Sequence, residues 1–432
     1  MIAHNATSGK SRPSLPIRQL AYHCLLCYNA NNTVSRARRT GSAVTHIETR
    51  KERPVKIETF ALERWLSAHE LHVEYDIGES GILPLTISDL LALEPAAGRD
   101  RVLERLLDLP LGYSEAPGTL ELRSLLAGTY AHCGPDNILV TTGAIEANFL
   151  LFNVLLDPGD HVVAPYPAYQ QLYSVPRALG CDVDLWHVRP ENDFCFDLDE
   201  LERLVRPETR LIVINSPHNP TGAILSAADL QRVYDLARSV GARILSDEAY
   251  RWLTIPGSGD PVPPIYDLGP NGISVGTLSK PFGLPGLRIG WMAAPADIVA
   301  RCWAMRDYVS LSPGKLNDTL AILALKHRAR IFERNQSIIA ANLAAANAWI
   351  AGHAGLLSWK PPRGGLLALL HYNLDIPSLD MADRLADSYG VLMAPGSAFG
   401  LEHCLRIGIG QEPAVFAAAL ERVSACLADL QA

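Results

Sequence analysis

The most informative segment of this chain is Thr277-Leu278-Ser279-Lys280-Pro281-Phe282-Gly283-Leu284-Pro285-Gly286-Leu287-Arg288. It begins where a short β-branched run, 273–277, ends, and such a run predicts a buried strand. A lysine alone after a strand would indicate little. Here a serine precedes Lys280, Arg288 follows eight residues later, and glycines lie between them. The combination indicates a functional loop at the end of a strand.

Apolar runs and helical patterns alternate on both sides of this loop. The runs with the length and composition of buried strands are 138–142, 161–165, 211–215, 243–247 and 273–277. Helical stretches such as 227–240 lie between several of them, which predicts an α/β fold with a mainly parallel sheet covered by helices on both faces. The segment 60–71 predicts an amphipathic helix. An Ala-rich helix at 331–351 opens a smaller α+β domain.

Three of the predicted strands end in groups suited to one heterocyclic phosphate cofactor. The strand 211–215 leads into Ser216-Pro217-His218-Asn219-Pro220-Thr221-Gly222, and the strand 243–247 leads into Glu248-Ala249-Tyr250. Ligands of open parallel sheets bind outside the carboxyl ends of the strands. We therefore expect these two segments and the Lys280 loop to meet.

These motifs resemble the class I/II aminotransferases, which are fold-type I enzymes that use pyridoxal 5′-phosphate (PLP). The resemblance runs from about Leu111 to Ile409, and its most specific parts are 219–222, 247–250 and 279–288. It implies that Lys280 forms a Schiff base with PLP and moves the proton at the substrate Cα.

The resemblance also implies contacts with the cofactor ring. Asp247 would keep the pyridine nitrogen protonated, while a helix cap is the other common role of an aspartate at a strand end. Asn219, which also borders the substrate, and Tyr250 would hydrogen-bond the ring hydroxyl. Tyr169 would stack on the ring, and a core aromatic is its alternative role.

The cofactor phosphate needs anion recognition. A guanidinium, two hydroxyls and a helix N-terminus are suited to it, and the residues that supply them are Arg288, Thr277, Ser279, Gly143, Ala144 and Ile145. Tyr113 resembles the residue that reaches the phosphate of a neighbouring subunit, which implies a homodimer with shared active sites. Arg406 matches the family's clamp for the substrate α-carboxylate, and a surface ion pair is the alternative.

The resemblance changes at 76–82, where common aminotransferases have a proline two residues after a glycine. This chain has Gly78-Glu79-Ser80-Gly81 instead, which is similar to capreomycidine synthases, PLP enzymes that cyclise a hydroxylated arginine. Glu79 and Gly81 are candidate substrate contacts, and a solvated loop acid is the alternative for Glu79. Two reactions therefore stand: aminotransfer between an amino acid and a 2-oxo acid, and a cyclase/lyase reaction that keeps the nitrogen.

Composition limits the remaining classes of function. The chain has 432 residues and a net charge of −8, which gives no electrostatic case for nucleic acid. The chain has no run of about 18 apolar residues, which is the length that a membrane-spanning helix needs. Eight scattered cysteines favour reduced thiols in the cytoplasm. The single C-x-x-C pair, Cys24 and Cys27, has no second pair, so no metal site is expected.

The first 53 residues differ from the rest, with nine Lys and Arg against two Asp and Glu. They lack a convincing apolar segment for secretion, and we expect a disordered basic tail, with a transit peptide as the alternative. Three parts should follow: an N-terminal arm with the first part of the small domain at 54–94, the PLP-binding large domain at 95–313, and the C-terminal small domain at 314–432.

Overall fold

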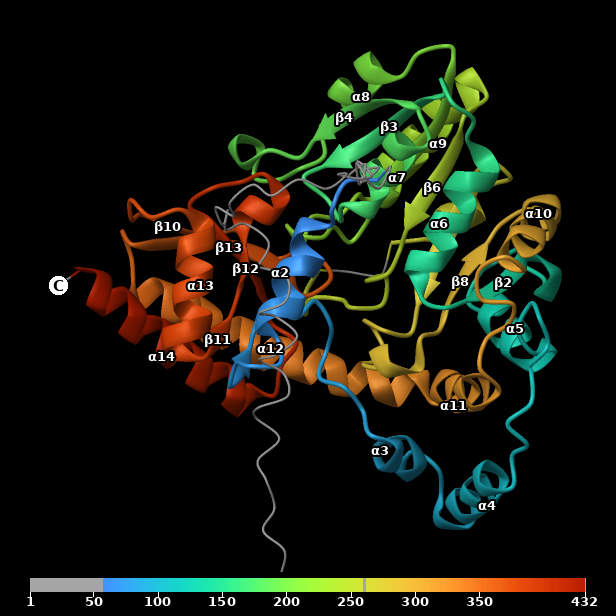
Figure 1. The fold of residues 1–432 in the computed structure, drawn as a ribbon, viewed down its shortest axis with the longest axis horizontal. Coiled ribbons are helices and arrows are strands. Elements are labelled where there is room, and N and C mark those ends of the chain that lie inside the picture. Colours follow the sequence, from blue (N-terminus) through green and yellow to red (C-terminus); the bar gives the residue numbers. More distant parts are fainter. Residues whose placement is uncertain (1–56, 259–261, 432) are drawn as a thin grey trace, which may run out of the picture. The chain divides into compact units, whose positions relative to one another are not determined.

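A computed structural model describes residues 57–258 and 262–431. They belong to one compact unit, Val55–Ala432, and the finer division into domains stays a prediction. The predicted tail and its Cys24–Cys27 pair lie outside the described residues. A seven-stranded sheet and a four-stranded sheet organise the unit, and a short two-stranded pair adds to them (Figure 1).

The large sheet has seven strands in the spatial order β2-β8-β7-β6-β5-β3-β4. They are β2 (Ile138–Thr141), β3 (His161–Tyr166), β4 (Asp182–His187), β5 (Thr209–Asn215), β6 (Arg243–Asp247), β7 (Gly272–Thr277) and β8 (Gly290–Ala293). All neighbours pair in parallel except β8, which is antiparallel to both β2 and β7. The predicted mainly parallel sheet is confirmed.

Helices cover both faces of this sheet because its strands are apolar on both sides. In β5, Leu211 and Val213 face one core while Ile212 and Ile214 face another. The first core packs against α6 (Ala144–Leu155), α7 (Gln171–Ala178) and α10 (Ala296–Arg306), and the second against α8 (Leu198–Leu204) and α9 (Ala227–Val240). Such two-sided burial is typical of parallel sheets.

Local signals fix the ends of α9, which matches the predicted helix 227–240. The Ser226 hydroxyl accepts from the Asp229 N–H, and the Asp229 carboxylate accepts from the Ser226 N–H in return. Gly241 ends the helix in the left-handed conformation, at φ +74°, which glycine adopts without steric cost.

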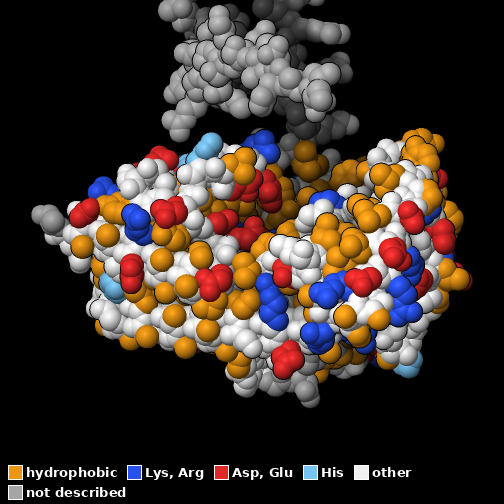
Figure 2. Space-filling model, turned by 90° about the horizontal axis from the view of Figure 1, so that it is seen from below, with side chains coloured by type: hydrophobic (Ala, Val, Ile, Leu, Met, Phe, Trp, Pro, Cys, Tyr) orange, Lys and Arg blue, Asp and Glu red, His pale blue; other side chains and the backbone are white. Residues whose placement is uncertain are grey.

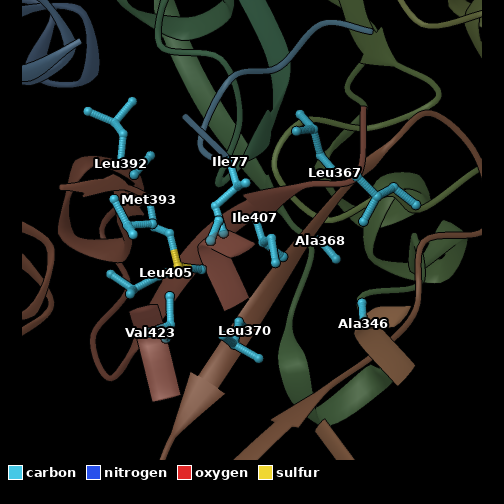
Figure 3. Close-up of a cluster of buried hydrophobic side chains, with 14 of the residues drawn as sticks. Ile77, Ala346, Leu367, Ala368, Leu370, Leu392, Met393, Leu405, Ile407 and Val423 are labelled. Atoms are coloured by element: carbon cyan, nitrogen blue, oxygen red, sulfur yellow. The ribbon is translucent and has the colours of Figure 1, made fainter. Parts of the chain in front are cut away.

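The small sheet is antiparallel, in the order β12-β13-β10-β9. Its strands are β9 (Leu357–Trp359), β10 (Leu367–Tyr372), β12 (Ala394–Pro395) and β13 (Cys404–Gly408), and α12 (Arg328–Gly352), α13 (Ser378–Tyr389) and α14 (Pro413–Gln431) pack with it. Figure 3 shows the buried side chains between these elements, among them Leu370, Leu405 and Val423. The predicted α+β character of this region is confirmed.

The N-terminal segment joins this small sheet region. A two-stranded parallel pair links β1 (Tyr75–Asp76) to β11 (Val391–Leu392). The remaining helices are α2 (Ala61–His69), α3 (Ile87–Ala92), α4 (Ala96–Leu107), α5 (Leu120–Ala127) and α11 (Lys315–Lys326). α2 confirms the helix predicted at 60–71.

Within residues 57–258 and 262–431, none of the helices combines the length and hydropathy that a membrane span needs. The same residues contain no cluster of three His, Cys, Asp or Glu side chains that could hold a metal ion. Acidic, basic and apolar side chains are interspersed on the face shown in Figure 2, and acidic ones gather beside a hollow near its middle.

Candidate active site

The carboxyl ends of β5, β6 and β7 lie side by side, because these three strands are neighbours in the sheet. Asn215, Asp247 and Thr277 are their last residues. The segments that carry Asn219, Tyr250 and Lys280 therefore start from one edge of the sheet, as the sequence predicts.

A cavity of about 460 Å³ lies at this edge. Most of the predicted site residues line it: Ala144, Ile145, Tyr169, Asn219, Asp247, Tyr250, Thr277, Ser279, Lys280, Arg288 and Arg406. Residues that the sequence did not single out complete the wall: Leu62, Glu63, Arg64, Leu66, Ser80, Asn148, Asn215, Ala249 and Pro285.

The Lys280 ammonium has two partners from the N-terminal segment. Its Nζ donates to Ser80 Oγ at 2.7 Å and to Glu79 Oε1 at 3.1 Å. Burial alone would lower the pKa of this ammonium, but Glu79 and Tyr250 outweigh burial and the net direction is upward. In return, the positive charge of Lys280 lowers the pKa of Glu79. Glu79 is therefore a partner of the lysine, although its side chain keeps 42% of its surface exposed.

Asp76 shapes the turn that places Glu79 and Ser80. Its Oδ1 accepts from the N–H groups of Gly78 at 3.0 Å and Glu79 at 2.8 Å. Gly81 follows close to the lysine, since a Cβ added there would lie 3.8 Å from Lys280 Cδ and 3.2 Å from Glu79 Oε1. Gly81 thus borders the site through its backbone.

Asp247 is buried at the base of the cavity. Its carboxylate accepts from Asn148 Nδ2 at 2.9 Å and from the Ala249 N–H at 3.1 Å. Burial raises the pKa of this carboxyl, and the two hydrogen bonds oppose the rise. Among the described residues, no cationic side chain forms an ion pair with it, so a protonated ring nitrogen fits this position.

Asn215 connects two strand ends. Its Nδ2 donates to the Asp247 carbonyl at 2.9 Å, and its Oδ1 accepts from the Asn219 N–H at 2.8 Å. The Asn219 side chain in turn accepts from Arg406 Nη1 at 3.2 Å. A continuous hydrogen-bonded path therefore joins Asp247 to Arg406.

Arg406 is a fully buried guanidinium on β13, with 1% of its surface exposed. Its Nη2 donates to the Gly78 carbonyl at 2.7 Å, and its Nε has no hydrogen-bond partner among the described residues. Burial lowers the pKa of this group, while the charges of Tyr250, Glu79, Asp76 and Glu63 oppose that change. A buried guanidinium with a free donor fits a carboxylate ligand, which excludes the alternative of a surface ion pair.

The opposite end of the cavity is suited to an anion. Gly143 precedes α6, a helix of 12 residues, and has no side chain to accept hydrogen bonds from its first turn. The first N–H groups of the helix are therefore left to bind an anion. Gly143 has φ +78°, a left-handed conformation that favours glycine, and a Cβ there would lie 2.5 Å from the Arg288 Nη2 and so displace this guanidinium. Thr277 and Ser279 add hydroxyls that lie 3.0 Å apart. The helix begins at Ala144, directly after the glycine.

Tyr169 and α2 form the remaining wall. The Tyr169 ring lies 4.9 Å from the Phe60 ring, centroid to centroid, and its hydroxyl donates to Glu63 Oε1 at 3.4 Å. Tyr113 does not line the cavity and is 85% exposed. Within a single chain, the predicted site is therefore assembled except for this tyrosine.

Comparisons with known proteins agree with this geometry. Residues 110–423 match the family model described as aminotransferase class I and II. The chain belongs to the class I and II aminotransferases. Its cofactor is PLP, and it is a fold-type I enzyme.

Two curated relatives cover most of the chain. Capreomycidine synthase from Streptomyces vinaceus is 34% identical over 361 residues, which are 82% of this chain and 90% of that protein. Arginine–pyruvate transaminase AruH from Pseudomonas aeruginosa is 27% identical over 359 residues, which are 81% of this chain and 91% of that protein.

Two solved structures have similar folds. A PLP-dependent aminotransferase from Streptococcus suis is 36% identical with a TM-score of 0.82, covering 87% of this chain and 99% of the other. The PLP-dependent cyclase OrfR is 32% identical with a TM-score of 0.80, covering 88% and 99%. Relatives that are aminotransferases and a relative that is a cyclase thus share this architecture.

The residues present fit PLP. The anion-binding end suits its phosphate, the buried Asp247 carboxylate suits a protonated pyridine nitrogen, and the Lys280 amine suits its aldehyde. Among the side chains that sequence motifs missed, Asn148 and Ser80 contact the predicted residues Asp247 and Lys280 directly. Asn148 lies one helical turn after Ala144 on α6 and so faces the same side, a spacing that could have revealed it.

Proposed function

We propose that this enzyme is an aminotransferase that acts on an α-amino acid at the carbon bearing the amino group. One observation carries the proposal: Lys280, Asp247 and Arg406 face one cavity from three different segments of the fold. Bound PLP supplies an electron sink for negative charge at the substrate Cα. The side chains of this chain supply attachment, orientation and proton transfer.

Lys280 holds the cofactor and afterwards moves the proton at Cα. Ser80 and Glu79 fix the position of its Nζ through hydrogen bonds of 2.7 and 3.1 Å. Asp247 keeps the ring nitrogen protonated, and Asn148 orients the carboxylate for that task. Asn219 and Tyr250 are placed to donate to the ring hydroxyl.

Anchoring uses the two ends of the cavity. Arg288, Ser279 and the N-terminus of α6 bind the phosphate, as Gly143 allows by its lack of a side chain. Tyr169 packs on the ring. Arg406 binds the substrate carboxylate with a planar pair of donors, which fixes the orientation of the amino acid beside Lys280.

A second candidate reaction is ring closure with loss of a leaving group from the substrate side chain. Ser80 occupies the position where common aminotransferases have proline, and its hydroxyl contacts Lys280. A leaving hydroxide needs a proton, and the Ser80–Lys280–Glu79 cluster could deliver one. Similarity to capreomycidine synthase and to the cyclase OrfR supports this candidate, while similarity to arginine–pyruvate transaminase supports the first.

We also propose that the enzyme works as a homodimer with shared sites. Tyr113 is exposed, and so are the neighbouring apolar side chains Leu107 at 76% and Leu111 at 81%. Exposed apolar side chains grouped in this way are typical of an interface. In this arrangement Tyr113 completes the phosphate site of the partner.

The test is mass spectrometry of the purified enzyme with a panel of amino acids, with and without 2-oxoglutarate. A keto product that needs the acceptor supports aminotransfer. A product lighter by one water that forms without the acceptor supports ring closure instead. Failure of every α-amino acid to react, while PLP remains bound, would contradict both.

A further inference from the structure

Three charged side chains at the cavity have no assigned contact with the substrate in the scheme above, and two of them, Glu63 and Arg64, have no role in it at all. Lys280, Asp247, Arg288 and Arg406 serve the cofactor and the substrate backbone. Glu63 and Arg64 on α2 also line the cavity, and Glu79 lies beside its lysine. Any of them that faces a substrate side chain would select its charge.

We propose that Glu63, assisted by Glu79, selects amino acids whose side chain ends in a cation such as an amine or a guanidinium. The inference rests on the proposed function, because it assumes that Arg406 binds the α-carboxylate. It is independent of whether aminotransfer or ring closure follows.

The position of Glu63 is fixed because α2 is held at both ends. At its start, the Ala61 N–H donates to Gln170 Oε1 at 2.9 Å, next to α7 of the large sheet. From its middle, Trp65 Nε1 donates to Asp383 Oδ1 at 2.7 Å, on α13 beside the small sheet, and at its other end His69 Nε2 lies 3.5 Å from the same oxygen. Figure 1 shows α2 lying between the two sheet regions. The helix therefore forms a wall that joins them.

Glu63 lines the cavity, and its carboxylate can accept further hydrogen bonds. It is half-buried, and one of its oxygens accepts from the Tyr169 hydroxyl at 3.4 Å. In the described part of the chain, no Lys, Arg or His lies within ion-pair distance of it. Its charge nevertheless reaches Arg406, together with those of Asp76 and Glu79.

The proposed binding mode directs the substrate side chain toward this wall. The Cα of an amino acid carries three heavy substituents: the carboxylate, the amino group and the side chain. Arg406 fixes the first of these and Lys280 the second. The phosphate end of the cavity is taken by the cofactor, so the third substituent extends toward α2. There it meets the half-buried Glu63, whereas Arg64 on the same helix also lines the cavity but is exposed. A carboxylate at this place attracts a cation and repels an acidic side chain.

The test measures binding to the PLP-loaded enzyme without turnover. Three probes lack the Cα proton and so cannot react further: α-methylornithine with a cationic side chain, α-methylnorvaline with a neutral one of the same carbon skeleton, and α-methylglutamate with an acidic one. Their dissociation constants are measured by calorimetry for the wild type, Glu63→Gln and the matched control Arg64→Gln. Glu63→Gln keeps an acceptor for Tyr169, and an unchanged visible absorbance of bound PLP confirms an intact site.

We expect the wild type to prefer the cationic probe over the neutral one. Glu63→Gln should reduce this preference about tenfold, which is about 1.4 kcal/mol, mainly by weaker binding of the cationic probe. Arg64→Gln should leave the preference in place. Glu63 is the more informative position because a change at Glu79 would also alter Lys280.

The inference would be overturned if Glu63→Gln kept the wild-type preference for the cationic probe. It would also be overturned if the wild type bound the acidic probe best and Arg64→Gln abolished that preference. Failure of the inference differs from failure of the proposed function. If all three probes bind with similar affinity and Arg406→Lys weakens them all, the proposed function stands and the inference falls. If none binds, the α-amino acid substrate itself is wrong.

Discussion

Asn148 donates a hydrogen bond of 2.9 Å to the buried carboxylate of Asp247. The bond joins the helix that starts at the anion-binding end, α6, to the carboxyl end of strand β6. It opposes the rise in the Asp247 pKa that burial causes. The net direction of the pKa is still upward, so the hydrogen bond offsets only part of the effect of burial on the charged carboxylate that the proposed role at the ring nitrogen requires.

Replacing Asp247 by alanine should reduce turnover by more than about tenfold, or roughly 1.4 kcal/mol in the activation barrier. The ring nitrogen would lose the charge that keeps it protonated. Asn148→Ala should have a smaller effect in the same direction, because the carboxylate remains. Steady-state kinetics at saturating substrate check this, with circular dichroism as the control for folding. A larger loss in Asn148→Ala than in Asp247→Ala would contradict the assignment.

Arg406→Lys keeps a positive charge but loses the planar pair of donors. We expect amino acid binding to weaken by about tenfold or more, while the absorbance of bound PLP stays unchanged. Amines that lack the carboxylate should bind the variant and the wild type equally. A variant that handles carboxylated and decarboxylated substrates in the wild-type ratio would show that Arg406 reads another group.

Asp76 should make the stability of the protein depend on pH. Burial, with help from Glu79, raises its pKa from 3.8 to about 6. The folded protein therefore binds this proton more tightly than the unfolded chain, so the contribution of Asp76 to stability is lost as pH rises from about 4 to about 6. Asp76→Asn keeps an oxygen for the Gly78 and Glu79 N–H groups. Relative to wild type, the variant should gain stability across that pH range, measured by urea unfolding.

Asp89 provides a control of opposite sign. Its hydrogen bonds with Thr86 at the start of α3 lower its pKa, so its stabilising contribution is present at neutral pH and is lost in acid. Asp89→Asn should therefore be less stable than wild type at pH 7, and the difference should shrink as pH falls. If both variants respond to pH with the same sign, the role of Asp76 is wrong.

Sequence patterns predicted the strands of the large sheet where β-branched residues concentrate, as in β5 and β6. They missed β8, Gly290-Trp291-Met292-Ala293, because these residues have little β-propensity as a group. Its extended form comes from antiparallel pairing with β2 and β7. They also missed β4, an edge strand whose polar and apolar residues are mixed. Tertiary pairing, and not local preference, forms both strands.

In the site, too, some residues could be predicted from local sequence and others only from the tertiary fold. Lys280 and Asp247 were predictable because each lies in a local motif at the end of a strand. The Ser80–Lys280 contact joins residues 200 positions apart, and the Asn148–Asp247 contact joins residues 99 positions apart. Glu63 reaches the cavity only because α2 is tied to both sheet regions. Contacts of this kind depend on the whole fold and leave no local signal.

Tyr113 tests the proposed dimer. We expect the purified enzyme to have twice the mass of the chain by light scattering, and Tyr113→Ala to lose PLP affinity. Lys280→Ala cannot bind PLP covalently. A mixed dimer of Tyr113→Ala and Lys280→Ala chains nevertheless contains one site in which both Lys280 and Tyr113 are present. Activity should therefore return to about a quarter of the wild-type level when equal amounts of the two variants are unfolded and refolded together, because about half of the dimers are mixed and each mixed dimer has one of its two sites intact. No recovery in a mixture that forms dimers would place Tyr113 outside the site.

Glu79 should control how readily Lys280 reacts with PLP. The amine must be neutral to attack the PLP aldehyde, and Glu79 stabilises its charged form across 3.1 Å. Burial would lower the lysine pKa if Glu79 did not oppose it. In Glu79→Gln the pKa of Lys280 should fall, so a larger fraction of the amine is neutral at pH 7. Binding of PLP to the cofactor-free variant should then be faster at neutral pH, and the pH dependence of the rate should move to lower pH.

Stopped-flow absorbance during reconstitution measures this rate across a pH series. Glu63→Gln is the matched control, because it removes a carboxylate from the same cavity without touching Lys280, and its profile should follow the wild type. Ser80→Ala separates the hydrogen bond from the charge: it removes a 2.7 Å contact with Nζ but leaves Glu79 in place, so its profile should shift less than that of Glu79→Gln. A Glu79→Gln profile that coincides with the wild type would mean that the Glu79–Lys280 pair does not set the reactivity of the amine.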